Sequence, residues 1–447
     1  MKSGTQDMTQ GSPLRLITLF ALPLMLGNVF QQMYMLVDAA VVGKALGVNA
    51  LAAMGAADWL NWMMLGVIQG FAQGFAILMA QQYGAKQMQA LRKTVGLSVV
   101  LAGFTSVILM LLGQLLLPVI LGLLDTPQEV VADSASYLRI MFWAAPVVMA
   151  YNLLASILRA LGDGRTPLLA MIVASLVNIG LDLLFVLVFH WGIPGAAIAT
   201  VIAQMCAAAF CLVRLSKLSI MQLQRHDFAV TPAAAWRLYR LGIPMALQNM
   251  IIAVGGLIIQ RVVNGYSVAF IAGFTATNKL YGVLEIAATS YGYAMVTYVG
   301  QNLGAGKLDR IRKGITTASA VSVAISLVIG SVMLLFGKQI LHLFVSGEPS
   351  DIDMAIQTGY SYLVHMSLCL PSLYILHVTR SSLQGMGNTF LPMCSGAAEF
   401  VVRTAAVLTL PLLLNAQGIY LAEVFAWIGA DVILIPGCIR QIRKCST

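Results

Sequence analysis

Polar side chains in three apolar stretches of this sequence have the types and spacing of a cation site. Asn178 and Asp182 are four residues apart in the stretch MIVASLVNIGLDLLFVLVF, so a helix would place them on one face. Thr200 follows a GIPGAA turn and lies four residues after Ala196, and Asp38 is the only charge in its own apolar stretch. Carboxylate, amide and hydroxyl oxygens suit Na⁺. The same carboxylates could instead hold a proton, because burial favours their neutral form.

Each of these polar groups also has a structural interpretation. An amide or hydroxyl inside a membrane protein often hydrogen-bonds a neighbouring helix, and this is an equal alternative for Asn178 and Thr200. The two aspartates favour a functional role, because an acid at the centre of a membrane helix costs about 2.5–3.5 kcal/mol on insertion scales.

The composition indicates the class of protein that holds these residues. The chain has 447 residues, of which 59% are hydrophobic and only 10% are charged, and its mean hydropathy is +0.86. Soluble domains carry about 25% charged residues. The low content of charged residues extends along the whole chain. The sequence therefore predicts an all-α polytopic membrane protein, whose partner is the lipid bilayer.

Apolar segments separated by glycine, proline or charged breaks predict twelve transmembrane helices. They cover residues 14–42, 50–80, 94–117, 130–158, 168–190, 194–215, 241–264, 268–299, 314–336, 355–384, 390–414 and 418–439. Several exceed the ~20 residues that a span requires, so we expect tilted or bent helices. Pro23 and Pro146 lie inside predicted spans and could bend them.

Basic residues in the loops predict the orientation. Nearly all loop lysines and arginines fall on the side that holds both termini. By the positive-inside rule both termini are cytoplasmic, which requires an even number of spans and supports twelve. The net charge of +9 then reflects topology, and we expect no nucleic-acid partner.

Three motifs recur in the same order after a shift of 220–226 residues. AQQYGA at 80–85 matches GQNLGA at 300–305, RALGDGRTP at 159–167 matches QGMGNTFLP at 384–392, and GIPGAAIA at 192–199 matches GIYLAEVF at 418–425. The repeat predicts two six-helix lobes in the same orientation, residues 1–215 and 241–447, joined by a cytoplasmic linker at 216–240. This arrangement is typical of an alternating-access transporter.

The second lobe differs from the first at the acidic positions. Glu399 and Arg403 are four residues apart and can neutralise each other inside a bundle, with a place on a substrate or proton path as the alternative. Lys279, Tyr281 and Glu285 in the eighth predicted span are further candidates for the substrate cavity, and structural or snorkelling roles are the alternative for them.

Catalytic motifs are absent from the sequence. It has no GxSxG, HExxH or P-loop pattern, and its five histidines are scattered. Its six cysteines have no CxxC spacing, so we expect free thiols. We therefore predict a protein that is not an enzyme, needs no cofactor and is not driven by ATP.

Several motifs together resemble those of the multidrug and toxic compound extrusion (MATE) family. They are LVDAAVVG at 36–43, RALGDGRTP at 159–167, NIGLDLL at 178–184, and the Gln/Gly/Ala loops at 80–85 and 300–305. The likeness covers nearly the whole chain and is greatest to bacterial members with an acidic site in the N-terminal lobe. It implies a V-shaped, twelve-helix antiporter that exports organic, often cationic, compounds in exchange for Na⁺ or H⁺.

The resemblance also implies roles for individual residues. The residues that match the cation site of the family's N-terminal lobe, and whose oxygens would ligate Na⁺ in a sodium-coupled member, are Asp38, Asn178, Asp182, Thr200 and, through its carbonyl, Ala196. Pro23 matches the proline at which the first helix bends, and Tyr34 matches the tyrosine one turn before the acid. Tyr34 and Gln31 are candidates for the substrate cavity.

The expected mechanism is ion-coupled alternating access. Ion binding from outside would bend the first helix at Pro23, shrink the cavity of the N-terminal lobe and expel the substrate. A flippase or exporter of a lipid-linked or anionic metabolite on a related fold is the main alternative, and a membrane enzyme or receptor is a third class. We expect a monomer in the cytoplasmic (inner) membrane of a bacterium, with small organic molecules as substrates.

Overall fold

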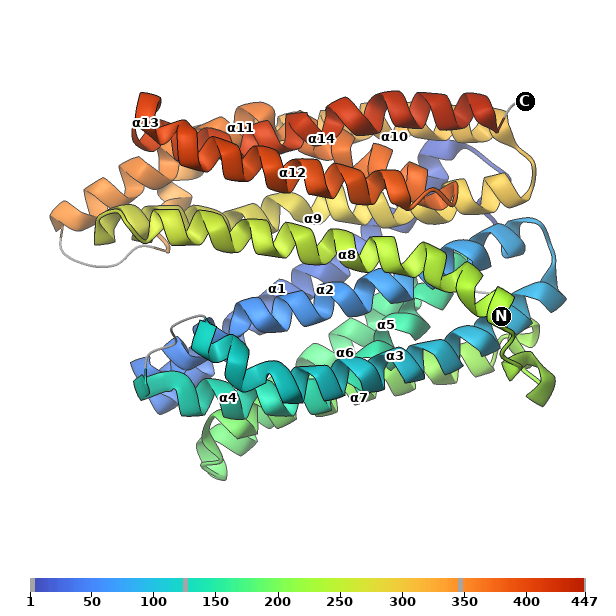
Figure 1. Ribbon diagram of the computed structural model, residues 1–447, viewed down its shortest axis with the longest axis horizontal. Coiled ribbons are helices and arrows are strands. Elements are labelled where there is room, and N and C mark those ends of the chain that lie inside the picture. Colours follow the sequence, from blue (N-terminus) through green and yellow to red (C-terminus); the bar gives the residue numbers. More distant parts are fainter. Residues whose placement is uncertain (1–4, 124–127, 345–348, 446–447) are drawn as a thin grey trace. The chain divides into compact units, whose positions relative to one another are not determined.

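The computed structural model describes residues 5–123, 128–344 and 349–445, and these residues form helices and connecting turns without strands (Figure 1). The chain divides into two compact units. Unit 1 comprises Met1–Gln10 and Leu22–Leu247, and unit 2 comprises Gly11–Ala21 and Gln248–Thr447. We describe each unit by itself.

Unit 1 is a bundle of long helices. Its helices are α1 (Pro13–Leu46, from Leu22 onward), α2 (Val48–Gly84), α3 (Met88–Leu123), α4 (Gln128–Trp143), α5 (Ala145–Ala160), α6 (Arg165–Asp182), the π-helix η1 (Leu183–Val188) and α7 (Gly192–Ser216). Two short 3₁₀ turns, η2 (Ser219–Met221) and η3 (Arg225–Phe228), follow α7. The pairs α6–α7, α2–α5 and α5–α7 pack against each other.

Helices α4 and α5 form one membrane span with a bend of 51° at Ala144. Pro146 lies in the first turn of α5. A proline has no N–H to donate and its ring crowds the preceding turn, so the helix cannot continue straight through it. The predicted bend at this proline is therefore present.

Unit 2 is a second helical bundle. Its helices are the C-terminal part of α8 (Pro232–Val263), α9 (Val268–Gly304), α10 (Leu308–Leu341), α11 (Pro349–Gly385), α12 (Phe390–Thr409), the short α13 (Pro411–Leu414) and α14 (Ala416–Lys444). Helix α11 packs against α9, α10 and α14, and α12 packs against α14.

The helices confirm the predicted membrane architecture. In the described part of the chain ten helices are long and apolar enough to cross a membrane, and the bent pair α4–α5 is an eleventh. Helix α9 corresponds to the remaining predicted span, 268–299; it is 37 residues long, and glycine, serine, threonine and two charges lower its hydropathy. The observed helices extend beyond most predicted spans, because the polar residues at the span ends continue the helical turns.

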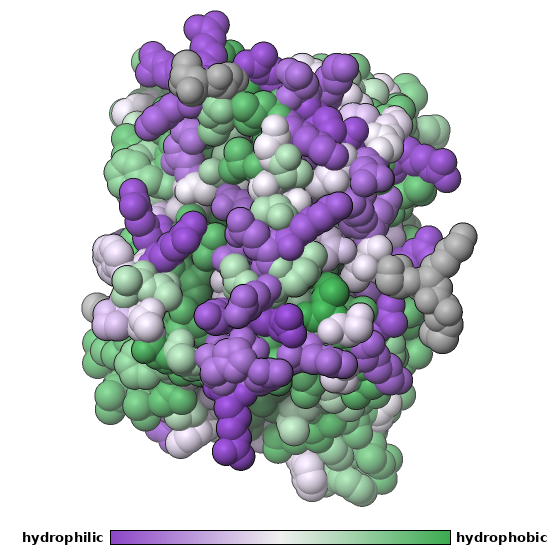
Figure 2. All heavy atoms as spheres, turned by 90° about the vertical axis from the view of Figure 1, so that its right-hand side faces the viewer, coloured by the Kyte–Doolittle hydropathy of each residue, from purple (hydrophilic) through white to green (hydrophobic). Residues whose placement is uncertain are grey.

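Apolar side chains lie on the outer surfaces of the helices as well as inside. Leu115 is 72% exposed and Leu335 is 71% exposed. Large exposed apolar surfaces are rare on soluble monomers. Figure 2, which views the side on which the C-terminus lies in Figure 1, shows hydrophilic side chains gathered at the helix ends and hydrophobic ones on the flanks. Lipid covers such flanks in a membrane.

The compact units differ from the predicted lobes at two places. Residues 11–21, the start of α1, belong to unit 2 rather than to the N-terminal unit. In the predicted linker 216–240, residues from Pro232 onward are the first turns of α8. Pro232 starts this helix because a proline at its first position lacks an N–H that would have no helical partner anyway. The lobes as functional parts stay a prediction.

Within unit 1, α2 and the first part of α8 approach each other at glycines. A Cβ atom built on Gly70 would lie 2.5 Å from the Cα of Ala246, and one built on Gly74 would lie 2.5 Å from the Cα of Gly242. Small residues spaced by four allow two membrane helices to touch through their backbones. The first part of α8 therefore packs against α2 through close backbone contacts, and a larger side chain at Gly70 or Gly74 would clash there.

Candidate cation-binding site

The candidate site in unit 1 is built on α6 and α7, which pack against each other. Asn178 and Asp182 are one turn apart near the end of α6, and their exposed fractions are 1% and 0%. Ala196, which is also fully buried, lies one turn before the half-buried Thr200 on α7. The spacing of four residues on each helix thus places both pairs on faces that meet.

A hydrogen bond joins the two helices within this site. The side-chain amide of Asn178 donates to Thr200 Oγ1 across 3.3 Å. This bond uses the nitrogen of the amide, and Asn178 Oδ1 is buried without a hydrogen-bond partner among the described residues. The carbonyl oxygen of the amide is therefore available to a ligand.

The carboxyl group of Asp182 has the most unusual environment of the site. Both of its oxygens are buried, and neither has a hydrogen-bond partner in the described part of the chain. Burying an ionised carboxylate without compensation is very unfavourable. Asp182 must therefore bind a proton or a cation to be stable in this position.

Asp38 and Tyr34 on α1 complete the site. Asp38 is 8% exposed, and its carboxyl group is close enough to that of Asp182 to interact with it electrostatically. Tyr34, one turn before Asp38, interacts with both acids in the same way. Two neighbouring carboxyl groups repel each other when both are ionised, which strengthens the requirement for a proton or a cation between them.

The backbone changes its geometry directly after Asp182. Helix α6 ends at this residue and continues as the π-helix η1, whose first residue is Leu183. The π geometry is rare and is frequent at functional sites. No proline lies at this change of helix geometry, and the nearest glycine before it, Gly180, lies two residues before Asp182.

Pro23 and Gln31 are the other residues predicted on α1. Both are half-buried, and α1 continues as a helix through Pro23. Pro23 lies two residues after Ala21, where the division of the chain passes from unit 2 to unit 1. Its role as a hinge and the role of Gln31 in a substrate cavity stay predictions.

A buried network of charges in unit 2 contains the predicted Glu399–Arg403 pair. These two side chains are 3.9 Å apart, but each has a shorter contact elsewhere. Glu399 Oε1 accepts a hydrogen bond from Arg380 Nη2, and Arg403 Nη2 donates to Glu423 Oε1 across 2.8 Å. The pairing is therefore a chain of alternating charges on α11, α12 and α14 rather than an isolated pair along one helix.

The candidates on α9 differ in their surroundings. Lys279 is exposed. Glu285 Oε1 is 3.1 Å from His377 Nε2 on α11, and Tyr281 stacks on Trp427 of α14 at a centroid distance of 6.0 Å. The structure thus brings Tyr281 and Glu285 to neighbouring helices of unit 2, whereas Lys279 faces outward.

Two partners in unit 2 were not predicted from the sequence. They are Arg380, which contacts Glu399, and Ser372, which donates a hydrogen bond to Asp431. Arg380 is 7% exposed and is the cation that Glu399 contacts on another helix. Asp431 on α14 accepts a hydrogen bond from Ser372 across 2.6 Å. The signal for Arg380 was present, because an arginine inside a predicted span requires a carboxylate partner.

Other kinds of site are not found among the described residues. There is no group of three or more His, Cys, Asp or Glu residues that could hold a metal ion. All six cysteines are free thiols, as predicted.

Comparisons with known proteins agree with this architecture. A family model described as MatE matches residues 23–184 and 244–408. Probable multidrug resistance protein YpnP of Bacillus subtilis (strain 168) is 30% identical over 385 residues, which are 85% of this chain and 84% of that protein. Probable multidrug resistance protein NorM of Thermotoga maritima is 24% identical over 92% of this chain and 88% of its own.

Solved structures show the same fold. A structure described as the outward-facing conformation of a multidrug resistance MATE family transporter matches with a TM-score of 0.91. The match covers 100% of this chain and 99% of that chain at 20% sequence identity. The two segments matched by the family model begin at Pro23 and Pro244, near the start of the first helix of each predicted repeat.

Proposed function

The chain belongs to the MatE family of multidrug efflux transporters, and from this premise we propose that it is a secondary active antiporter. It exports organic, often cationic, compounds in exchange for Na⁺ or H⁺. The coupling ion binds in unit 1, and its ligands are Asp38, Asn178, Asp182, Thr200 and the carbonyl of Ala196.

The observation that carries this proposal is the carboxyl group of Asp182. Both of its oxygens are buried without a hydrogen-bond partner among the described residues, and Asp38 is within electrostatic reach. A proton would neutralise one carboxyl group, and Na⁺ would accept oxygens from both. Either ion removes the cost of burying two acids together, so the site has a strong affinity for one of them.

Coupling requires that the ion and the substrate favour different states of the carrier. The ligands of the ion come from α1, α6 and α7. Ion binding draws α1 toward α6 and α7, which reduces the space available to a substrate in unit 1. Pro23 gives α1 a position at which it bends, because its ring removes one backbone hydrogen bond from the helix. Release of the ion to the cytoplasm then restores the affinity for substrate.

The buried charges of unit 2 support a cationic substrate over an anionic one. The buried charged side chains among the described residues of unit 2 are three carboxyl groups, Glu399, Glu423 and Asp431, and two guanidinium groups, Arg380 and Arg403. Arg380 contacts Glu399 and Arg403 contacts Glu423. Because both arginines are already paired, they do not offer the cationic cavity that a flippase of a phosphate-containing lipid would need.

The charges at the helix ends support a cytoplasmic location of both termini. The last turn of α14 carries Arg443 and Lys444. The loops predicted on the same side of the membrane as the termini are also rich in lysine and arginine. By the positive-inside rule this pattern supports an orientation with both termini inside, and we propose the cytoplasmic membrane of a bacterium as the location.

Transport by purified protein in liposomes tests the proposal, with a Na⁺ or a pH gradient imposed one at a time. We expect one of the gradients to drive uptake of a fluorescent organic cation into the liposomes by the protein molecules that are inserted inside out. Asp38→Asn and Asp182→Asn should each lower the rate at least ten-fold. Asp133→Asn, which removes an exposed carboxylate on α4, is the matched control and should transport like the wild type.

Uptake by Asp38→Asn at the wild-type rate would overturn the assigned coupling site. Failure of both gradients to drive any cation, together with translocation of a lipid-linked anion by the same protein, would favour the flippase instead.

A further inference from the structure

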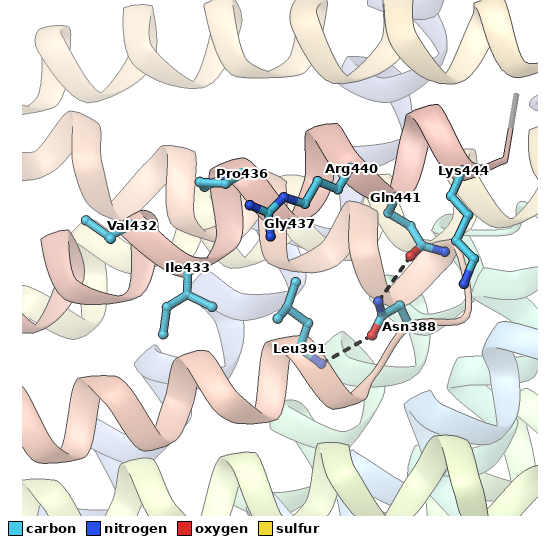
Figure 3. A pocket seen from close by; sticks show the side chains of 9 residues that line it. All are labelled: Asn388, Leu391, Val432, Ile433, Pro436, Gly437, Arg440, Gln441 and Lys444. Atoms are coloured by element: carbon cyan, nitrogen blue, oxygen red, sulfur yellow. Dashed lines mark hydrogen bonds between the residues drawn. The ribbon is translucent and has the colours of Figure 1, made fainter.

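A cavity of about 500 Å³ lies in unit 2 between the start of α12 and the last turns of α14. One part of its wall is apolar and includes Leu391, Ile433 and Pro436. The other part is polar and includes Asn388 and Arg440 (Figure 3). None of the nine residues that line it is acidic. The cavity is therefore amphipathic, with the positive charges of Arg440 and Lys444 at its polar end.

Two hydrogen bonds hold the polar edge of the cavity in place. The side-chain amide of Asn388 donates to Gln441 Oε1 across 3.2 Å, and Asn388 Oδ1 accepts from the backbone N–H of Leu391 at 3.2 Å (Figure 3). These bonds fix the turn before α12 against α14. The shape of the cavity between α12 and α14 is therefore defined by hydrogen bonds at its edge.

Arg440 lies beside this edge without a carboxylate. Its side chain is exposed, and no Asp or Glu oxygen of the described residues forms a salt bridge with it. In Figure 3 the guanidinium group extends from α14 toward Gly437. The positive charge is therefore available to an anion that enters the cavity.

The internal repeat provides a comparison within the same molecule. Asp163 of RALGDGRTP corresponds to Asn388 of QGMGNTFLP, and the preceding Gly162 and Gly387 have nearly the same φ, 82° and 83°. In the frame of the repeat Arg214 corresponds to Arg440. In unit 1 Asp163 Oδ2 is 3.6 Å from Arg214 Nε.

Unit 1 thus neutralises its arginine internally, whereas unit 2 has replaced the acid by an amide. Asn388 preserves the hydrogen bond to the start of the following helix, which is the structural part of the role of Asp163. It does not provide the negative charge. With Asn388 in place of an aspartate, the turn keeps its hydrogen bond, but Arg440 has no carboxylate partner at this position.

We propose that this cavity binds an anionic phospholipid, with the phosphate group on Arg440 and an acyl chain along Leu391, Ile433 and Pro436. Arg440 is near the end of a 29-residue membrane helix, the depth at which lipid headgroups lie. The apolar wall continues to Val432, which is 68% exposed on the lipid-facing surface of α14. Basic pockets between membrane helices bind anionic headgroups in this way. The proposal rests on the membrane location of α14 and does not require ion coupling.

Native mass spectrometry of the delipidated protein in detergent tests the proposal. Phosphatidylglycerol, phosphatidylcholine with the same acyl chains, and soluble glycerol phosphate are titrated separately. We expect tight binding of phosphatidylglycerol only. Arg440→Gln should weaken its binding roughly five-fold, the effect of one basic residue near a charged lipid. Asn388→Asp should weaken it at least as much, because the new carboxylate recreates the internal pair of unit 1.

Arg443→Gln is the matched control, because it removes the same charge from the same helix at a residue that does not line the cavity. It should bind phosphatidylglycerol like the wild type. The proposal is overturned if Arg440→Gln binds like Arg443→Gln, if phosphatidylcholine binds equally well, or if glycerol phosphate competes at the same concentration as the lipid. None of these readouts depends on transport, so a failure here is distinct from a failure of the antiport function.

Discussion

The side-chain amide of Asn178 on α6 donates a hydrogen bond to the hydroxyl of Thr200 on α7, with 3.3 Å between the two heavy atoms. The bond orients the amide so that its nitrogen faces α7 while its carbonyl oxygen is left for another partner. The hydrogen bond therefore also orients the carbonyl oxygen of Asn178, which lies one helical turn from Asp182 on α6.

Thr200→Val should weaken ion binding because it removes both the acceptor of the Asn178 amide and one oxygen of the site. We expect about ten-fold weaker binding of the coupling ion, and a loss of stability of about 1 kcal/mol from the broken hydrogen bond. The measurement is the concentration of Na⁺ or protons that gives half of the ion-induced rise in Tm of the purified protein.

Thr200→Ser retains the hydroxyl and is the control for this substitution. It should keep ion binding within two-fold to three-fold of the wild type, a range about as wide as the scatter of such measurements. Equal ion binding by the valine and serine variants would show that the hydroxyl is not a ligand and that its bond to Asn178 is structural only.

Arg403→Leu should destabilise unit 2 strongly. It would leave Glu423, whose side chain is 11% exposed, without the guanidinium group that donates to it at 2.8 Å. Removing one partner of a buried ion pair costs about 3–5 kcal/mol. The free energy of unfolding in mixed micelles measures the effect, and Lys279→Leu, which removes an exposed cation, should change it by less than about 0.5 kcal/mol.

The double variant Arg403→Leu/Glu423→Leu separates loss of the charge pair from loss of the arginine itself. Apolar replacement of a whole buried pair is often neutral, so most of the stability should return. A double variant as unstable as Arg403→Leu would show that the contact of Arg403 with Glu399, or its packing, dominates instead.

The local spacing of residues was sufficient to predict the faces of single helices. Four-residue spacing placed Asn178 with Asp182 and Ala196 with Thr200, and the structure brings these pairs together on packed helices. Hydropathy accounts for eleven of the predicted spans in the described part of the chain, and the bend in the fourth follows from Pro146. These features depend on properties that each segment has by itself.

Partners on different helices could not be predicted in the same way. Glu399 was assigned to Arg403 along one helix, but its closest cation is Arg380, which is 19 residues away in sequence. The assignment of residues 11–21 to unit 2 was also missed. Both depend on packing between distant segments, for which a single sequence contains no spacing rule.

Gly74→Val should disrupt unit 1 at the contact between α2 and α8. A Cβ atom on Gly74 would lie 2.5 Å from the Cα of Gly242, and backbone atoms cannot move aside as a flexible side chain can. Overpacking costs about 1–3 kcal/mol, so the Tm should fall by several degrees. Gly103→Val on α3 is the control, because a Cβ there would meet nothing within 4 Å. A smaller fall in Tm for Gly74→Val than for Gly103→Val would contradict the close backbone contact.

Pro23→Ala should slow transport without weakening ion binding. Alanine can donate the backbone hydrogen bond that proline lacks, which makes α1 harder to bend at the point just after it leaves unit 2. We expect at least a five-fold lower rate of ion-driven uptake, while the ion-induced rise in Tm stays at the wild-type value. Pro118→Ala, which makes the same change inside α3, should leave the transport rate within two-fold of the wild type. If Pro23→Ala transports as fast as Pro118→Ala, α1 does not act as a hinge at this proline and the coupling movement must occur elsewhere in unit 1.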